Sequence, residues 1–156
     1  MAISVNSKAP VLTLKRKTNE GLKDVSLSEY IGKKKTVILF FPFAFSSICK
    51  DELCSISGGM DQYSALDAQV IGISVDLPFA LEAFANINGI NFPLLSDFNK
   101  EAATAYDVLY TDIAGLKGVA KRSAFVVGED GTILFSSSSD DPKQLPPFDE
   151  IKAVLQ

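Results

Sequence analysis

The sequence contains no histidine and only two cysteines among its 156 residues. The lack of histidine excludes Ser-His-Asp and Cys-His catalytic groups as well as histidine-based metal sites. Two cysteines are also too few for a disulfide scaffold or for a four-thiolate zinc site. We therefore expect neither a metal nor a cofactor, and any nucleophile in this chain has to be activated in another way.

Positive charge and long apolar runs are scarce as well. The net charge is −4, and the one basic run, Lys33-Lys34-Lys35, is typical of a solvated turn. This balance does not favour a nucleic-acid partner or an anionic membrane surface. No window approaches the roughly 20 apolar residues that span a bilayer, and the first residues lack the pattern of a signal peptide. The sequence therefore predicts a cytoplasmic protein.

What the sequence contains instead is an alternation of apolar runs with amphipathic stretches, over a length typical of one domain, residues 1–156. Strands that alternate with helices favour a largely parallel sheet, and a late hairpin adds antiparallel strands. The predicted fold class is α/β, with a mixed central sheet flanked by helices. We expect strands at 11–15, 36–41, 69–75, 92–95, 123–127 and 132–135, helices at 26–32, 78–87, 99–106 and 148–155, and a loop at 136–139. A further helix starts after Ser46 or Ser47 and stops at Gly58-Gly59, and a second segment to about Leu66 is a candidate continuation of it.

The most informative stretch lies between residues 41 and 52. A buried strand ends at Pro42, and Ser46 or Ser47 can cap the helix that follows. Sheets of this class place their active sites where a strand leads into a helix. If Ser46 is the cap, Cys49 is the third helical residue, where free backbone N–H groups and the helix dipole favour a thiolate. The alternative is that Cys49 is a small core residue.

The pattern Pro42-x-x-x-Ser46-x-x-Cys49 resembles the signature of the peroxiredoxins, the AhpC/TSA family. The resemblance implies a thioredoxin-like fold and a thiol-dependent peroxidase that reduces hydrogen peroxide and organic hydroperoxides. It makes Cys49 the peroxidatic nucleophile, with Pro42 as its shield and Ser46 as a hydrogen-bond partner of the peroxide. The matching arginine is Arg122, which in the family holds thiolate and peroxide together. The likeness extends through Ala9-Pro10-x-Leu-Thr-Leu, Phe92-Pro93-Leu-Leu-Ser-Asp97 and Val-Val-Gly-Glu-Asp-Gly131.

Arg122 is a candidate on the residues alone as well. The chain has two arginines, and Arg16 lies in a Lys-Arg-Lys cluster typical of a solvated strand edge. Arg122 opens an apolar strand, where its charge needs a partner, either Cys49 or a structural carboxylate. Complete ionisation of an ordinary thiol at pH 7 gains only roughly 30-fold. Fast peroxide reduction needs more, which we expect from Arg122, Ser46 and backbone N–H groups acting on the peroxide.

Cys54 is the second candidate for redox chemistry, because a sulfenic acid formed on Cys49 has to be reduced again. Five residues of α-helix separate two Cα atoms by on the order of 8–9 Å. A disulfide needs about 7 Å or less, so Cys54 can reach Cys49 only if the helix unwinds. Gly58-Gly59 close behind lowers the cost of that unwinding.

The resemblance leaves two roles open for Cys54. In the bacterioferritin comigratory type of peroxiredoxin, a resolving cysteine stands five residues after the peroxidatic one, which implies an intramolecular disulfide reduced by thioredoxin or a similar dithiol protein. Other segments look more like the alkyl hydroperoxide reductase E-like, one-cysteine subgroup, in which an outside thiol does the resolving. We expect Cys54 to be the resolving cysteine, and the alternative is a passive helix cysteine.

Asp51 and Glu52 are adjacent on the predicted helix, so their side chains point about 100° apart and do not form a catalytic pair. Stabilisation of the helix start explains them better. The resemblance gives Glu52 a supporting place in a hydrogen-bond network below the site.

Exposed aromatic residues are candidates for a dimer face, and the one-cysteine subgroup implies a homodimer. The candidates are Phe43, Phe45, Phe79 and Tyr110.

Two other functions compete with the peroxidase. A thiol-based peroxide sensor or redox relay would use the same residues, and only turnover separates it from an enzyme. A thioredoxin-like disulfide reductase is disfavoured, because its Cys-x-x-Cys is absent and the spacing of Cys49 and Cys54 is wrong for it.

Overall fold

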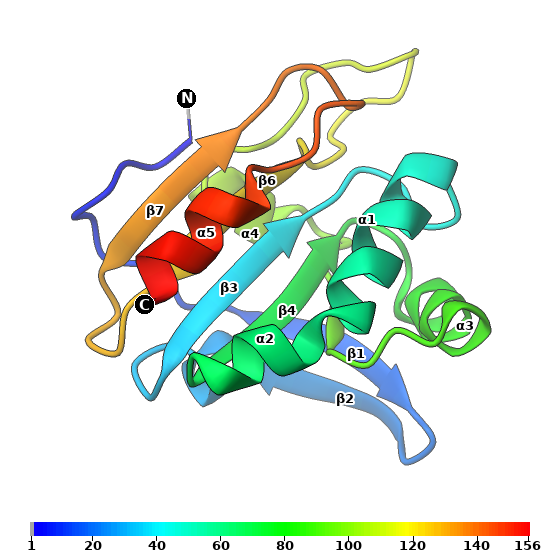
Figure 1. The fold of residues 1–156 in the computed structure, drawn as a ribbon. Coiled ribbons are helices and arrows are strands. Elements are labelled where there is room, and N and C mark those ends of the chain that lie inside the picture. The colour runs from blue at the N-terminus through cyan, green and yellow to red at the C-terminus, as the bar shows by residue number, and fades with distance from the viewer. Residues whose placement is uncertain (1) are drawn as a thin grey trace.

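Seven strands form one mixed sheet in the computed structural model, which describes residues 2–156 (Figure 1). In spatial order the strands are β2-β1-β5-β4-β3-β6-β7. β3 pairs in parallel with β4, and β4 with β5, whereas the other neighbours are antiparallel. The strands are β1 (Thr13–Thr18), β2 (Gly21–Ser26), β3 (Lys35–Phe40), β4 (Ala68–Ser74), β5 (Leu94–Ser96), β6 (Ser123–Val127) and β7 (Ile133–Ser138).

The helices divide between the two faces of this sheet. α1, α2, α3 and α5 contribute side chains to the core on one face, and α4 and η1 to the core on the other. In Figure 1, α1 and α2 accordingly lie in front of the part of the sheet around β4, α5 lies in front of β6, and α4 lies behind the sheet. The helices are η1 (Leu27–Glu29), α1 (Ser47–Gly58), α2 (Met60–Ala65), α3 (Pro78–Asn88), α4 (Glu101–Ala105) and α5 (Phe148–Leu155).

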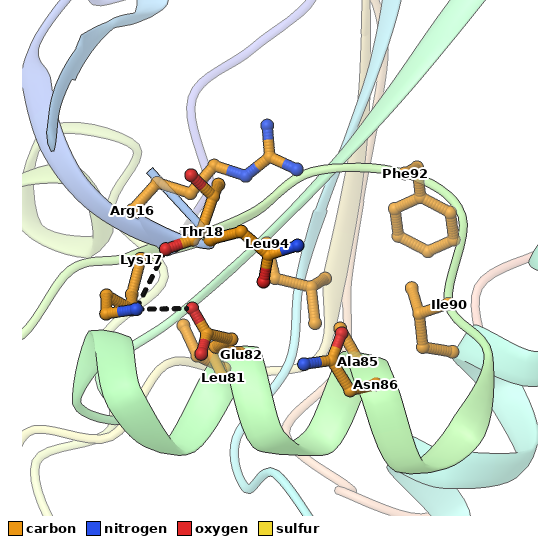
Figure 2. Close-up of a pocket in the computed structure, with 11 residues that line it drawn as sticks. Arg16, Lys17, Thr18, Leu81, Glu82, Ala85, Asn86, Ile90, Phe92 and Leu94 are labelled. Atoms are coloured by element: carbon orange, nitrogen blue, oxygen red, sulfur yellow. Dashed lines mark hydrogen bonds and ion pairs between the residues drawn. The ribbon is translucent and has the colours of Figure 1, made fainter. Parts of the chain in front are cut away.

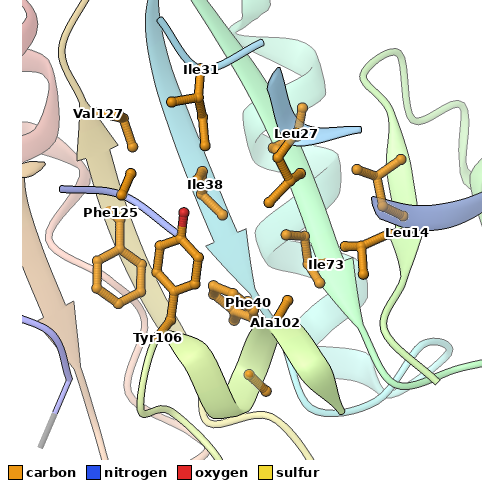
Figure 3. Packing of buried hydrophobic residues seen from close by; sticks show 14 of the residues in the cluster. Leu14, Leu27, Ile31, Ile38, Phe40, Ile73, Ala102, Tyr106, Phe125 and Val127 are labelled. Atoms are coloured by element: carbon orange, nitrogen blue, oxygen red, sulfur yellow. The ribbon is translucent and has the colours of Figure 1, made fainter. Parts of the chain in front are cut away.

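β3 is covered on both faces, which explains its uninterrupted apolar run. Residues 37–41 enter the two cores alternately, and each of them is completely buried. On the face shown in Figure 3, Phe40 packs against Tyr106 and Phe125, with ring centroids 5.4 and 6.0 Å away. The strand is therefore fixed from both sides at the point where the chain leaves it for α1.

Most of the elements predicted from the sequence are confirmed, including the first turn of α3 at Pro78 and α5 at 148–155. The predicted stop at Gly58-Gly59 is confirmed, because α1 ends at Gly58 and the second predicted segment forms α2. The first strand lies two residues later than predicted, because it pairs along its whole length with β2, which the sequence did not predict.

The expectation of a loop at 136–139 is wrong for most of that segment. Ser136, Ser137 and Ser138 belong to β7 and pair with residues 123–125 of β6. The ladder uses backbone groups alone, so a neighbouring strand can order serines whose own preference for strands is weak.

No helix within residues 2–156 is long and apolar enough to cross a membrane.

Candidate active site

Cys49 lies in the first turn of α1 and is completely buried. Ser46 is the N-cap of this helix, as predicted, and its Oγ accepts a hydrogen bond from the Cys49 N–H at 3.4 Å. The cap therefore uses one of the free N–H groups that we expected around the sulfur. The Ser46 hydroxyl hydrogen remains available for a further acceptor, because the oxygen serves here only as an acceptor.

Arg122 connects Cys49 to a second acidic side chain. Its Nη2 donates to Cys49 Sγ at 3.0 Å, its Nη1 donates to Glu52 Oε2, and its Nε donates to the Pro142 carbonyl at 2.8 Å. Arg122 directly precedes β6, which pairs with β3, so the sheet brings the guanidinium to the end of β3. Because all three nitrogens have partners, the plane of the guanidinium is fixed against the sulfur.

The ion pair between Arg122 and Glu52 is almost completely shielded from water, with side-chain exposures of 1% and 0%. Burial lowers the pKa of the Arg122 guanidinium, but the charges of Glu52 and Cys49 outweigh this effect and hold the pKa above its usual range. Burial raises the pKa of the Glu52 carboxyl to about 7, even though Arg122 acts in the opposite direction. One cation therefore serves two acidic groups in a dry environment.

Glu52 does not stabilise the helix start, contrary to our expectation for Asp51 and Glu52. The first turn of α1 contains no acidic residue, and Glu52 points inward to Arg122. Its second oxygen, Oε1, is buried and has no hydrogen-bond partner among residues 2–156. An unpartnered buried oxygen explains why burial dominates the pKa of this group.

Cys54 faces a different part of the molecule from Cys49. Its side chain is half-buried, and its Sγ contacts the carbonyl of Asn88, the last residue of α3, at 3.7 Å. Both thiols are free, and α1 is continuous from Ser47 to Gly58 between and around them. In this conformation the two cysteines are separated by an intact helical turn, as the sequence indicated.

Pro42 is buried in the segment that leaves β3. Two of the candidate dimer residues, Phe45 and Phe79, expose more than half of their surface, at 53% and 58%. Tyr110 does not belong to such a face, because only 7% of it is exposed and its hydroxyl donates to the Asp140 carbonyl at 2.8 Å. Phe43 is intermediate.

The sequence did not reveal that Asp76 belongs to this region. Asp76 follows β4, and its Oδ2 accepts a hydrogen bond from the Ala44 N–H at 2.9 Å. The available signal was topological, since parallel neighbours such as β3 and β4 end at the same edge of a sheet.

A separate hollow of about 170 Å³ lies between β1 and α3 (Figure 2). Lys17 Nζ closes one side of it by binding Glu82 Oε2 at 3.0 Å and the Thr18 carbonyl at 2.8 Å. Arg16 lines the hollow, in line with its expected place at a strand edge, and Cys49 does not. Two of the charged residues of this hollow, Lys17 and Glu82, are already paired with each other.

Comparisons with known proteins show the family of this chain. The model of the AhpC/TSA family matches residues 5–136. The chain is 31% identical over 144 residues to the chloroplastic 2-cysteine peroxiredoxin of Chattonella marina var. antiqua, covering 88% of this chain and 71% of that protein. It is 36% identical over 136 residues to alkyl hydroperoxide reductase E of Mycobacterium tuberculosis, covering 86% and 84%. The crystal structure of peroxidoxin BcpB from Mycobacterium tuberculosis superposes with a TM-score of 0.85 at 24% identity, covering 98% and 96%.

Proposed function

This chain belongs to the AhpC/TSA family of peroxiredoxins and is a thiol peroxidase with the thioredoxin-like fold of that family, and we propose that Cys49 is its peroxidatic nucleophile. The observation that carries the proposal is the 3.0 Å contact between Arg122 Nη2 and the buried Cys49 Sγ. A fixed cationic donor stabilises a thiolate more than a thiol. The guanidinium of Arg122 also lies beside the sulfur, where a peroxide would have to bind in order to react with it.

The first half-reaction transfers one oxygen atom. The Cys49 thiolate attacks the nearer peroxide oxygen, a sulfur–oxygen bond forms and the oxygen–oxygen bond breaks. The sulfur loses two electrons and becomes a sulfenic acid, and the leaving alkoxide or hydroxide takes up a proton to become an alcohol or water. Arg122 stabilises the charge that moves onto the leaving oxygen, and the free hydroxyl hydrogen of Ser46 orients the peroxide. Pro42, which is buried, shields the sulfur from water.

Cys54 resolves the sulfenic acid in the second half-reaction. Its thiolate attacks Cys49 Sγ, a disulfide forms, and the sulfenic oxygen leaves as water after taking up a proton. This step requires the first turns of α1 to unwind, because Cys54 now contacts Asn88 and an intact turn separates the two sulfurs. Thioredoxin or a similar dithiol protein then reduces the disulfide and restores both thiols.

Two alternatives remain as outcomes of the same test. In a one-cysteine peroxidase, an outside thiol would attack the sulfenic acid and Cys54 would remain passive. In a sensor, oxidised Cys49 would pass its oxidation to a protein partner once and would not turn over. The hydrogen peroxide and organic hydroperoxide classes both fit a site whose surroundings include Phe41 and Phe45.

A homodimer is the assembly that we propose. Phe45 and Phe79 present exposed rings close to the active-site loop, and a second copy would remove both rings from water. The test is the sedimentation of wild type and Phe79→Ser, in which the variant should sediment as a monomer at concentrations where wild type is a dimer.

The function is tested by steady-state consumption of peroxide with thioredoxin as the reductant. Wild type should turn over continuously, and Cys49→Ser should be inactive. Cys54→Ser should lose turnover with thioredoxin but keep the first oxidation of Cys49. Full turnover in Cys54→Ser would make the chain a one-cysteine enzyme, and a single oxidation without turnover in wild type would make it a sensor.

A further inference from the structure

The loop that leads from β3 into α1 is tied to the fold by one side chain. The Ala44 N–H donates to Asp76 Oδ2 at 2.9 Å. Among the hydrogen bonds of residues 2–156, this is the one that joins residues 42–45 to another part of the chain. Ser46, which follows, caps α1, so the position of this loop determines where the helix begins.

Asp76 is itself held in place by the ends of β4 and β5. Its Oδ2 also accepts from Ser74 Oγ at 2.8 Å, and its N–H donates to the same hydroxyl at 3.3 Å. Its carbonyl accepts from Ser96 Oγ at 2.6 Å. The aspartate does not cap α3, because the N-cap of that helix is Leu77 and has no side-chain hydrogen bond. The carboxylate is thus a fixed acceptor that faces the active-site loop.

The loop itself is under strain. Phe45 has a φ of 68°, in the left-handed region that costs free energy for any residue with a Cβ atom. Its ring is 53% exposed and touches Phe84 edge-on, with ring centroids 5.2 Å apart. A strained residue with half of its side chain in water keeps its place only when neighbouring contacts hold it. The Ala44–Asp76 hydrogen bond is the polar contact next to it.

We propose that Asp76 is a positioning residue that latches residues 42–46 and sets the balance between a closed and an open form of α1. In the closed form Cys49 meets Arg122, as it does in this structure. In the open form the first turn is unwound and Cys49 is accessible to a second thiol. Loss of the latch shifts the population towards the open form, which slows the reaction with peroxide and speeds the reaction of oxidised Cys49 with a thiol. The inference rests on the proposed role of Cys49.

Hydrogen exchange of the reduced protein tests the latch independently of catalysis. In Asp76→Ala, amides in residues 42–54 should exchange about tenfold faster, the effect of losing one hydrogen bond of ordinary strength. Asp76→Asn keeps an acceptor oxygen, so exchange should stay within about threefold of wild type. The matched control is Asp130→Ala, which removes a similar bond to the Thr132 N–H (3.0 Å) in the β6–β7 hairpin. It should leave exchange in residues 42–54 unchanged.

The kinetic readout follows the two reactions of Cys49 separately. In a Cys54→Ser background, which prevents the internal disulfide, Asp76→Ala should slow oxidation by hydrogen peroxide about tenfold, and should speed the reaction of the sulfenic acid with 2-mercaptoethanol by a similar factor. If Asp76 only stabilised the fold, Asp76→Ala would slow both of these reactions or would change neither.

Three results of the hydrogen-exchange experiment would contradict the proposed role of Asp76. Exchange in residues 42–54 could be unchanged in Asp76→Ala, it could rise equally throughout the sheet, or Asp76→Asn could behave like Asp76→Ala. If wild type consumed no peroxide, the proposed function would fail, and the exchange experiment would still decide whether Asp76 holds the loop.

Discussion

Two neighbouring units of this fold have the same layout and different chemistry. In each, a buried parallel strand leads through a short loop into a helix, β3 into α1 and β4 into α3. α1 starts with a side-chain cap and a buried cluster of Cys49, Glu52 and Arg122. α3 starts with Leu77, which makes no side-chain cap, and with Pro78.

The difference shows what the layout provides and what has to be added. A helix start supplies free N–H groups and a dipole at both places. At α1 a cation is added beside the cysteine, because Arg122 directly precedes β6, which pairs with β3, and reaches Cys49 Sγ. We propose that the reactive site depends on this added arginine and that the helix start alone does not make one.

Removal of the arginine should have the largest effect. Arg122→Met leaves Glu52 buried without its partner, so we expect a loss of about 3–5 kcal/mol in the free energy of unfolding. Without the donor at Cys49 Sγ, the rate of peroxide reduction should fall by about 100-fold or more. Urea denaturation and peroxide kinetics measure the two effects.

The double variant Arg122→Met, Glu52→Leu separates stability from catalysis. It should recover most of the lost stability, since no unpaired charge remains, and none of the lost activity. Recovery of activity together with stability would show that Arg122 acts only by keeping the fold intact.

The carboxyl of Glu52 should make stability depend on pH. Its pKa is raised from 4.5 to about 7, chiefly by burial, so the folded protein keeps a proton that the unfolded chain has already lost. This contribution is fully present below pH about 4.5, and it declines as the pH rises through about 7. The free energy of unfolding of wild type relative to Glu52→Gln should therefore fall by up to about 3 kcal/mol over this range. A difference that stays constant from pH 4.5 to 8 would contradict the raised pKa.

The cap of α1 should contribute to both stability and chemistry. Ser46→Ala should cost about 1 kcal/mol of stability as the Cys49 N–H loses its acceptor. It should also slow peroxide reduction by about tenfold or more, because the hydroxyl donor to the peroxide is gone. Ser26→Ala is the matched control, since Ser26 caps η1 by accepting from the Ser28 N–H at 3.2 Å. The control should lose stability alone, and equal activity in both variants would remove Ser46 from the mechanism.

The smallest effect is expected when α3 is given the cap that it lacks. Leu77→Ser supplies a side-chain acceptor at an exposed N-cap and should stabilise the protein by about 0.5–1 kcal/mol. Peroxidase activity should be unchanged, because Leu77 lies outside the cluster of Cys49, Glu52 and Arg122. A cysteine introduced at the start of α3 should not become reactive either. In Phe79→Cys, the new thiol should react with peroxide at the rate of a free cysteine.

Much of this could be predicted from the sequence, since each prediction rested on local patterns. The run at 36–41 identified β3, Ser46 identified the start of α1, and Pro42, Cys49 and Arg122 were candidates before their geometry was known. The resemblance to a family supplied the pairing of Cys49 with Arg122, which are 73 residues apart.

The remaining features depend on tertiary contacts that no local pattern encodes. Glu52 has an ordinary helical sequence context, from which we expected it at the helix start; the resemblance alone gave it a place in a hydrogen-bond network, and its partner there is Arg122. Asp76 precedes a helix and resembles a cap, but the parallel pairing of β3 with β4 directs its carboxylate to Ala44. β2 was missed because Gly21–Ser26 is largely exposed and polar, and it is ordered by β1.

The most direct test of the arginine's role is the rate of Cys49 oxidation by hydrogen peroxide at pH about 10, in a Cys54→Ser background. The thiolate fraction of each protein is measured in parallel by the ultraviolet absorbance of the thiolate, and the rates are compared per thiolate, so that the comparison does not depend on ionisation. We expect Arg122→Met, Glu52→Leu to oxidise at least about 100-fold more slowly than the parent. Equal rates would mean that the helix start suffices and that Arg122 does not act on the peroxide.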